Sequence, residues 1–153
     1  MSRRKGRIIA FQALHSWDVT KEPLEDLLSF TWLQKTEGET EDGEPIIKEF
    51  NEDQKEEQTF ASLIIAGTIE HIKEIDETIE SHLSSTWTLE RINKVTLAIL
   101  RTSVYQILFQ PDANIGIIIN EAVNISREYG TDDSYKFINA VLDKIGKDES
   151  KKK

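Results

Sequence analysis

Val95–Phe109 reads VTLAILRTSVYQILF, and ten of its fifteen residues are apolar. At helical spacing these residues fall on two stripes, so the segment needs packing partners on two sides. The run is longer than an ordinary strand, and Pro111 follows it closely, which is typical of the end of a helix. This stretch predicts a central buried helix around which the other helices of an all-α protein pack.

The length and composition limit the class of protein. The chain has 153 residues, which suits either one domain with its own core or two small helical bundles that share one helix. Cysteine is absent, which excludes disulfides and thiolate metal sites. No apolar run approaches the roughly 20 residues of a membrane span, and no secretory signal opens the chain. We therefore expect a soluble, cytoplasmic protein without a membrane partner.

The charge is unevenly distributed along the chain. The net charge is −9, yet the first seven residues include the cations Arg3, Arg4, Lys5 and Arg7. Residues 37–57 hold ten acids against two lysines, a local net charge of −8. The acidity is therefore largely local, and the cationic N-terminus is a candidate for binding a polyanion.

Six or seven helices and no strand are expected, within a single domain that spans 1–153. The expected helices run over about Arg3–Asp18, from Leu24, over Asp53–Leu83, Leu89–Asn93 and Val95–Phe109, over Ile115–Tyr129, and from an N-cap at Thr131 or Asp132 to Ile145. The segment 35–51 lacks periodicity and is expected to be a mobile acidic loop. Gly146 is expected to end the last helix, which leaves a charged, frayed tail over 146–153.

Two side chains in the expected core suggest specific contacts. Trp87 is expected to be a core anchor at the turn before the central helix. Arg101 is the one charge within the central run, and an isolated buried cation costs several kcal/mol. We expect it to pair with an acid, and Glu121 is the first candidate.

The first helix has one face for the core and another whose role is open. Its core stripe consists of Ala10, Ala13, Leu14 and Trp17. The opposite face carries Arg4, Lys5, Ile8, Phe11, Gln12 and His15. The apolar members of this face either meet a second layer of helices or join the cations and amide in an exposed surface for single-stranded RNA.

No pattern in the sequence indicates catalysis. It has no glycine-rich phosphate loop, no cysteine nucleophile, no serine elbow beside a histidine and no paired metal motif. His71 and His82 are eleven residues apart, which does not suit a shared metal on one helix. We expect a binding protein rather than an enzyme, with no cofactor and no metal.

Six motifs in order along the chain resemble the family of NusB, the bacterial transcription antitermination factor. They lie in Arg3–Trp17, Leu63–Gly67, Ile75–Asp76, Ile99–Tyr105, Ile119–Val123 and Tyr129–Asp143. Each motif is weak alone, but six in register are specific, and they span nearly the whole chain apart from the acidic loop. The resemblance implies two small helical bundles without catalytic activity. It also implies a protein that pairs with NusE, binds boxA RNA of ribosomal RNA operons and joins the antitermination complex of RNA polymerase.

The resemblance also implies site residues. Those for RNA are Arg3, Arg4, Lys5, Arg7, Gln12, Asp133, Lys136 and Phe137, and those for the partner are His15, Glu90 and Thr96. Thr96 stands where Glu is common in the family, and a neutral side chain cannot pair with a basic group on NusE.

Two alternatives belong to other classes. The first is a protein-only interaction module or homodimer, in which another chain covers Ile8, Phe11 and His15. The second is the RNA-binding domain of a ribosomal RNA methyltransferase, which ranks last because a cofactor domain would have to follow Lys153.

Overall fold

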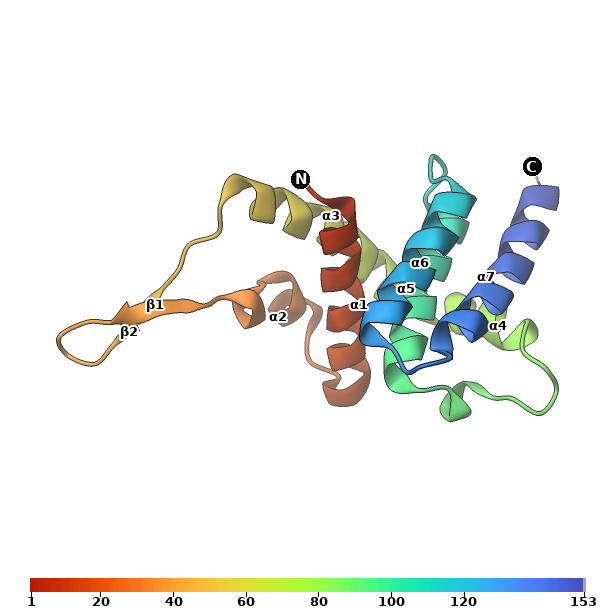
Figure 1. Ribbon diagram of the computed structural model, residues 1–153, viewed down its shortest axis with the longest axis horizontal. Coiled ribbons are helices and arrows are strands. Elements are labelled where there is room, and N and C mark those ends of the chain that lie inside the picture. The colour runs from red at the N-terminus through yellow and green to blue at the C-terminus, as the bar shows by residue number, and fades with distance from the viewer. Residues whose placement is uncertain (153) are drawn as a thin grey trace.

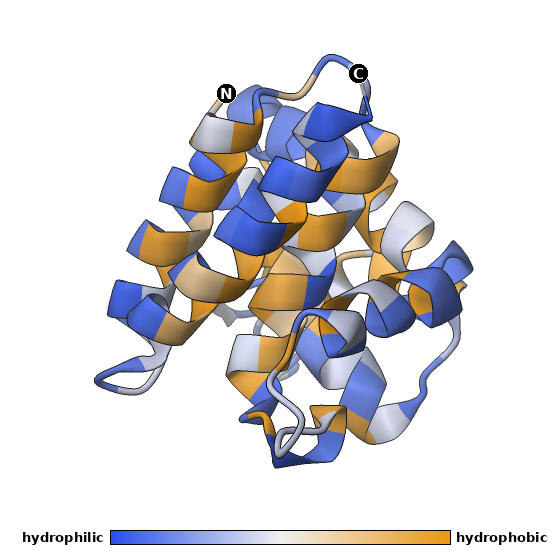
Figure 2. Cartoon of the chain, turned by 90° about the vertical axis from the view of Figure 1, so that its right-hand side faces the viewer, coloured by the Kyte–Doolittle hydropathy of each residue, from blue (hydrophilic) through white to orange (hydrophobic). Residues whose placement is uncertain are grey.

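A computed structural model describes residues 1–152, and α-helices dominate this part of the chain (Figure 1). Its elements are α1 (Arg3–Thr20), α2 (Leu24–Leu28), the 3-10 turn η1 (Thr31–Leu33), β1 (Thr36–Glu39), β2 (Pro45–Ile47), α3 (Glu52–Glu70), α4 (Ile72–Ser81), the 3-10 turn η2 (Leu89–Arg91), α5 (Lys94–Phe109), α6 (Ile115–Tyr129) and α7 (Ser134–Lys151). Helices in the view of Figure 2 carry orange apolar residues and blue polar residues side by side along their turns. The all-α class is confirmed, and no helix within residues 1–152 is long and apolar enough to cross a membrane.

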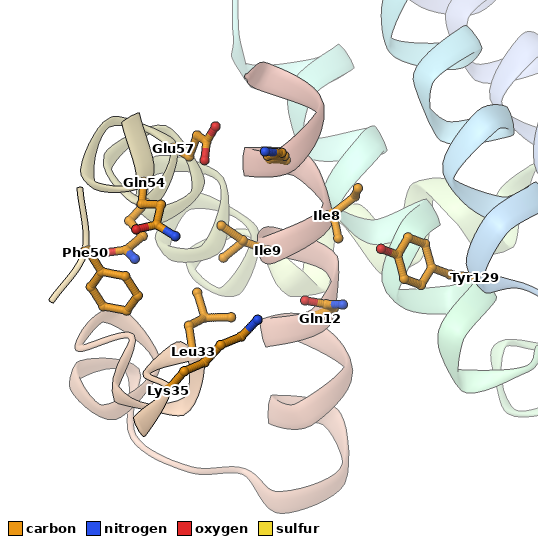
Figure 3. Close-up of a pocket in the computed structure, with 11 residues that line it drawn as sticks. Ile8, Ile9, Gln12, Leu33, Lys35, Phe50, Gln54, Glu57 and Tyr129 are labelled. Carbon is orange, nitrogen blue, oxygen red and sulfur yellow. The ribbon is translucent and has the colours of Figure 1, made fainter. Parts of the chain in front are cut away.

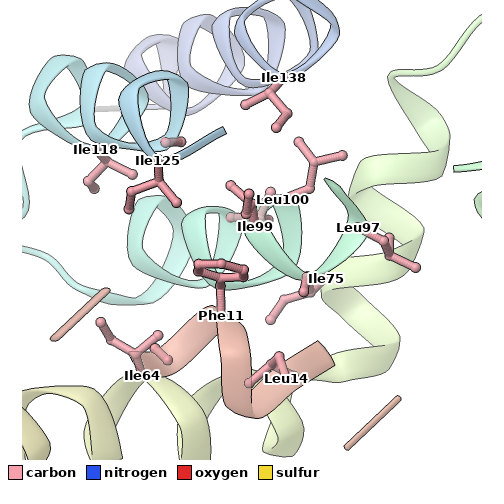
Figure 4. Close-up of a cluster of buried hydrophobic side chains, with 14 of the residues drawn as sticks. Phe11, Leu14, Ile64, Ile75, Leu97, Ile99, Leu100, Ile118, Ile125 and Ile138 are labelled. Atoms are coloured by element: carbon pink, nitrogen blue, oxygen red, sulfur yellow. The ribbon is translucent and has the colours of Figure 1, made fainter. Parts of the chain in front are cut away.

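The central helix is α5, as its sequence predicts. It begins after Asn93, whose side chain accepts hydrogen bonds from the backbone N–H groups of Val95 and Thr96. Its residues are buried on every side from Thr96 to Val104. Figure 4 shows α5 between α1 and α3 on one side and α6 and α7 on the other, with Ile75 of α4 nearby. Both apolar stripes therefore have packing partners.

The buried charge Arg101 does not pair with Glu121, contrary to the sequence prediction. Its Nε and Nη2 donate to the two carboxylate oxygens of Asp76 in α4, at 2.8 and 2.9 Å. Its Nη1 lies 3.2 Å from Asp18 Oδ1 in α1. Burial lowers the pKa of Arg101, but the hydrogen bonds to Asp76 and Asp18 raise it overall. The guanidinium thus joins three helices, α1, α4 and α5.

The expected long helix over Asp53–Leu83 is broken at His71. The residue has φ −106° and ψ 22°, outside the helical region, and separates α3 from α4. Two contacts with α5 accompany the break: the Tyr105 ring lies directly against Gly67, and the His71 ring stacks on Phe109 with centroids 4.0 Å apart. Neither His71 nor its immediate neighbours are helix-breaking residues. The break therefore depends on tertiary packing against α5.

The expected acidic loop contains a β-hairpin, so the expectation of no strand is wrong. Strands β1 and β2 pair antiparallel, with Thr36 opposite Ile47 and Glu39 opposite Pro45. Gly43 in the turn has φ 82°, a left-handed conformation that favours glycine. Both strands are exposed along their length, and the hairpin projects from the helices (Figure 1). Because neither face is buried, the hairpin lacks the apolar alternation of an ordinary strand.

The last helix continues beyond Gly146 to Lys151, so the residues from Gly146 to Lys151 are not a frayed tail. Gly146 is buried, and a Cβ there would stand 2.8 Å from Ile115 Cγ2 of α6. This glycine therefore permits close helix packing rather than ending the helix. The expected caps Thr131 and Asp132 also lie outside the helix, which begins after Asp133 without a side-chain cap.

Trp87 is exposed to 45 % and is not the expected core anchor. Its ring packs against Phe137 at the start of α7, with centroids 5.8 Å apart. The Arg91 guanidinium lies 5.7 Å from the same ring and donates to the Thr86 carbonyl at 2.7 Å. The tryptophan therefore covers the edge of the core and leaves one side open to solvent.

Replacing Arg101 by Met tests the buried ion cluster. The Arg101→Met variant leaves Asp76 without its cation and Asp18 with Lys94 alone, and we expect the free energy of unfolding to fall by about 3–5 kcal/mol. Urea unfolding followed by circular dichroism measures this loss. The control is Arg3→Met, an exposed site where the change should stay within about 0.5 kcal/mol. A similar small loss at Arg101 would contradict the assigned role.

The pH dependence of stability tests Asp18. Burial raises the pKa of this carboxyl, but hydrogen bonds from Lys94 and Arg101 outweigh it and lower the pKa to about 2. A lowered folded-state pKa stabilises the protein above the unfolded pKa, about 3.9, and this contribution is lost as the pH falls toward 2. We expect Asp18→Asn to cost about 2 kcal/mol at pH 6, with the deficit shrinking between pH 4 and 2.

Urea unfolding of the unaltered protein and of Asp18→Asn from pH 6 to pH 2 measures this difference in the free energy of unfolding. Asp26→Asn, at an exposed position of α2, is the control and should show no such narrowing. A deficit for Asp18→Asn that stays constant over this range would refute the predicted linkage.

Candidate RNA-binding surface

Helix α1 positions the predicted RNA-binding residues. Ser2 caps it by accepting a hydrogen bond from the Lys5 backbone N–H at 3.2 Å. Ala10, Ala13 and Leu14 of the expected core stripe are buried, and Trp17 is partly buried. Because this stripe packs on α3 and α5, the first turns of α1 present Arg3, Arg4 and Lys5 outward.

The opposite face of α1 is partly covered and partly exposed. Burial under another helix holds for one part of this face, and exposure to solvent holds for the rest. Phe11 is only 4 % exposed and contacts the Tyr129 ring edge-on, with centroids 5.4 Å apart. It is therefore covered by the end of α6 and is not a free platform for a base. Gln12 and His15 are partly exposed, and Arg4 is exposed.

Arg4 is held by an acid of α6. Its Nε and Nη2 donate to the carboxylate oxygens of Glu121 at 2.8 and 2.9 Å, yet 52 % of its side chain remains exposed. The hydrogen bond from Arg4 lowers the pKa of Glu121, so the carboxylate is ionised at neutral pH. Arg4 is thus accessible, but a phosphate would compete with Glu121 for it.

Arg7 is committed to the interior, unlike the other three cations of the N-terminus. Its Nε donates to Gln106 Oε1 of α5 at 2.8 Å, and its guanidinium lies 5.5 Å from the centre of the Phe60 ring of α3. Burial lowers the pKa of Arg7. These contacts tie Arg7 to α3 and α5, and its predicted role in RNA binding stays a prediction.

A cleft of about 420 Å³ runs along α1 (Figure 3). We call it the α1 cleft. Its wall on α1 is formed by Lys5, Ile8, Ile9 and Gln12, with Tyr129 beside them, and its other wall by Leu33, Lys35, Phe50, Gln54, Glu57 and Gln58. Two predicted RNA-binding residues, Lys5 and Gln12, therefore border a recess rather than a flat surface.

The residues of the second wall are absent from the sequence prediction. They flank the hairpin or belong to the first turns of α3, and the hairpin region was expected to be an unstructured loop. The one local signal is a capping box, in which Asn51 and Gln54 exchange side-chain to backbone hydrogen bonds of 2.8 and 2.9 Å. It marks the start of α3 but not the cleft.

The second group of predicted residues lies at the start of α7. Asp133 and Lys136 are exposed, and their charged groups are 3.8 Å apart. Phe137 is partly buried beneath Trp87. This group follows Tyr129, whose side chain points toward α1 in Figure 3. The chain therefore leads directly from the α1 cleft to the start of α7.

The predicted partner residues differ in accessibility. Glu90 in η2 is exposed, and His15 is partly exposed. Thr96 is only 3 % exposed in the first turn of α5, so its side chain is not available for direct contact with a partner. Neutral Thr suits this buried site because it leaves no unpaired charge there.

Among the described residues 1–152, the titratable groups do not gather into a metal site. Within residues 1–152, no three His, Asp or Glu side chains are placed to bind one metal ion. The lowered pKa values of Asp18 and Glu121 both arise in ion pairs with basic side chains. The exposed cations, the cleft and the amide groups suit binding of a polyanion instead.

Comparisons with known proteins identify the family of this chain. The family model described as the NusB family matches residues 4–147. The chain is 46 % identical to the transcription antitermination protein NusB of Treponema denticola, covering 95 % of this chain and 96 % of that protein. It is 42 % identical to NusB of Treponema pallidum, covering 96 % and 94 %.

Solved structures have the same fold. T. maritima NusB is 31 % identical, with a TM-score of 0.77 over 96 % of this chain and 92 % of that one. A crystal structure of the antitermination factors NusB and NusE in complex with double-stranded RNA gives 26 % identity and a TM-score of 0.75, over 95 % and 96 %. The helices, their order and the matched residues together place this chain in the NusB family.

Proposed function

We propose that the protein is a non-catalytic transcription antitermination factor that binds boxA-type RNA together with NusE. The observation that carries the proposal is the outward cluster of Arg3, Arg4 and Lys5 on an otherwise acidic chain, beside a cleft lined by Gln12. The relative solved with NusE and double-stranded RNA supports both the RNA and the partner. In this role the protein joins the antitermination complex of RNA polymerase in the cytoplasm, where bacterial transcription takes place.

One contact of α1 argues against a homodimer, and one relative argues against a methyltransferase domain. Tyr129 of the same chain already covers Phe11, so the apolar patch left for a homodimer is small. The Treponema denticola relative is covered over 96 % of its length and is named an antitermination protein, which favours that function over a methyltransferase domain. Sedimentation velocity distinguishes the first alternative, since a dimer that RNA leaves intact would support it.

The salt dependence of RNA binding tests the proposal. Three accessible cations that neutralise three phosphates predict a slope of log K against log salt of about −2 for single-stranded RNA. The Arg3→Ala/Arg4→Ala/Lys5→Ala variant should lose most of this slope and bind boxA-type RNA about 10-fold more weakly or worse. Fluorescence anisotropy at several salt concentrations, with NusE at a fixed concentration, measures both quantities.

The matched control removes the same charge elsewhere. Lys73, Lys144 and Lys147 are exposed residues of α4 and α7, and their triple Ala variant should keep the slope and affinity. Scrambled and double-stranded RNA in the same assay identify the form of RNA that is preferred. Equal loss in both variants would indicate a general charge effect and contradict a site on α1.

Releasing Arg4 should strengthen binding. Glu121→Gln removes the carboxylate that competes with phosphate, and the energy of an exposed ion pair corresponds to about a 1.5- to 5-fold gain in RNA affinity. Anisotropy measures this gain, and Glu80→Gln in α4 is a control with the same change in charge. Weaker binding by Glu121→Gln would mean that the carboxylate positions Arg4 for RNA instead of competing for it.

A further inference from the structure

We propose that the α1 cleft holds one unstacked base of the bound RNA, with Phe50 as the surface on which the base stacks. This inference rests on the proposed RNA-binding function and names what the cleft recognises. The residues that matter come from three parts of the chain: α1, the segment that leads into β1, and the segment from Phe50 into α3. They form a single recess in the folded protein (Figure 3).

The cleft has an apolar wall suited to the flat face of a base. Ile9, Leu33 and Phe50 point into the space between α1 and the base of the hairpin (Figure 3). Phe50 is partly buried, and no aromatic pair within residues 1–152 includes its ring. An aromatic face without an aromatic partner suits stacking by a base of single-stranded RNA.

Cations stand on both sides of this apolar wall. Lys5 of α1 lines the cleft. Lys35 extends across it with its ammonium group toward Gln12 (Figure 3). Within residues 1–152 neither lysine forms an ion pair. Both ammonium groups are therefore free to contact the phosphates that flank an inserted base.

A buried carboxylate favours a base over a phosphate as the occupant. Glu57 is 5 % exposed and lines the cleft, and its Oε2 accepts a hydrogen bond from the Ser2 backbone N–H at 2.9 Å. A negative group at this wall of the recess repels an inserted phosphate, whereas an inserted base carries no net charge for it to repel. The amide side chains of Gln12 and Gln54 provide donors and acceptors for the edge of the base.

The acids of the hairpin do not oppose this arrangement. Glu41, Asp42 and Glu44 lie in the hairpin turn, which points away from the helices (Figure 1). The cleft is at the other end of the hairpin, and Lys5, which lines it, directly follows Arg3 and Arg4 in the sequence. The RNA that contacts these cations can therefore place a base in the cleft without crossing the acidic turn.

Coupling between Phe50 and a single base tests the inference. The probe is single-stranded boxA-type RNA with NusE at a fixed concentration, together with RNAs in which one base at a time is replaced by an abasic site. For the unaltered protein, one abasic position should weaken binding by about 5- to 100-fold through lost stacking. Phe50→Ala should weaken binding of intact RNA similarly, and the same abasic position should then have no further effect.

Three further variants complete the design. Phe50→Trp keeps an aromatic surface and should keep the coupling, and Phe50→Leu replaces Phe50→Ala if the alanine variant fails a thermal melt. Ile47→Ala, an exposed change in β2 outside the cleft, is the control and should bind like the unaltered protein. Unchanged affinity and unchanged abasic penalties in the Phe50 variants would overturn the inference.

The same experiment tests the proposed function independently of the role of Phe50. If the unaltered chain binds RNA and the Arg3/Arg4/Lys5 variant does not, the function stands whatever Phe50 does. Failure of the unaltered chain with NusE to bind any of these RNAs would overturn both proposals.

Discussion

The buried guanidinium of Arg101 is the constraint on which the arrangement of the helices depends. It is 7 % exposed and is shared between Asp76 of α4 and Asp18 of α1. A buried cation is tolerated only with well-placed partners, so α1, α4 and α5 must meet at fixed rotations about their axes. This rotation determines which side of α1 enters the core. It thereby sets the outward direction of the cations in its first turns.

The sequence predicts the helices well where the signals are local. The apolar pattern of α5 and the bounds of α6 agree with the structure, because both depend on residues near in sequence. The partner of Arg101 does not follow from the sequence, since Asp18, Asp76 and Glu121 are all acids within reach of some helical arrangement. The choice among them is made by tertiary packing, which leaves Glu121 for Arg4.

The site is predicted only in part, for the same physical reason. The exposure of Arg3 and Lys5 follows from their place at the start of an amphipathic helix. The covering of Phe11 by Tyr129 and the hydrogen bond from Arg7 to Gln106 depend on contacts about a hundred residues apart in sequence. The α1 cleft depends equally on long-range placement of the hairpin, whose exposed strands carry no periodic signal. The local pattern thus predicts which residues can lie on the surface of a helix, and tertiary packing determines which of them stay exposed.

The distribution of charge explains why the surface needs more than cations. Of the four N-terminal cations, Arg7 is engaged in the interior and Arg4 is shared with Glu121, within a chain of net charge −9. Few phosphate contacts give weak, sequence-independent binding, so non-specific RNA competes poorly. Useful affinity must then come from a partner with basic surface and from contacts to the bases themselves. The α1 cleft, with Phe50 and the lysines Lys5 and Lys35, supplies contacts to a base. These contacts add affinity only where the RNA leaves a base unpaired.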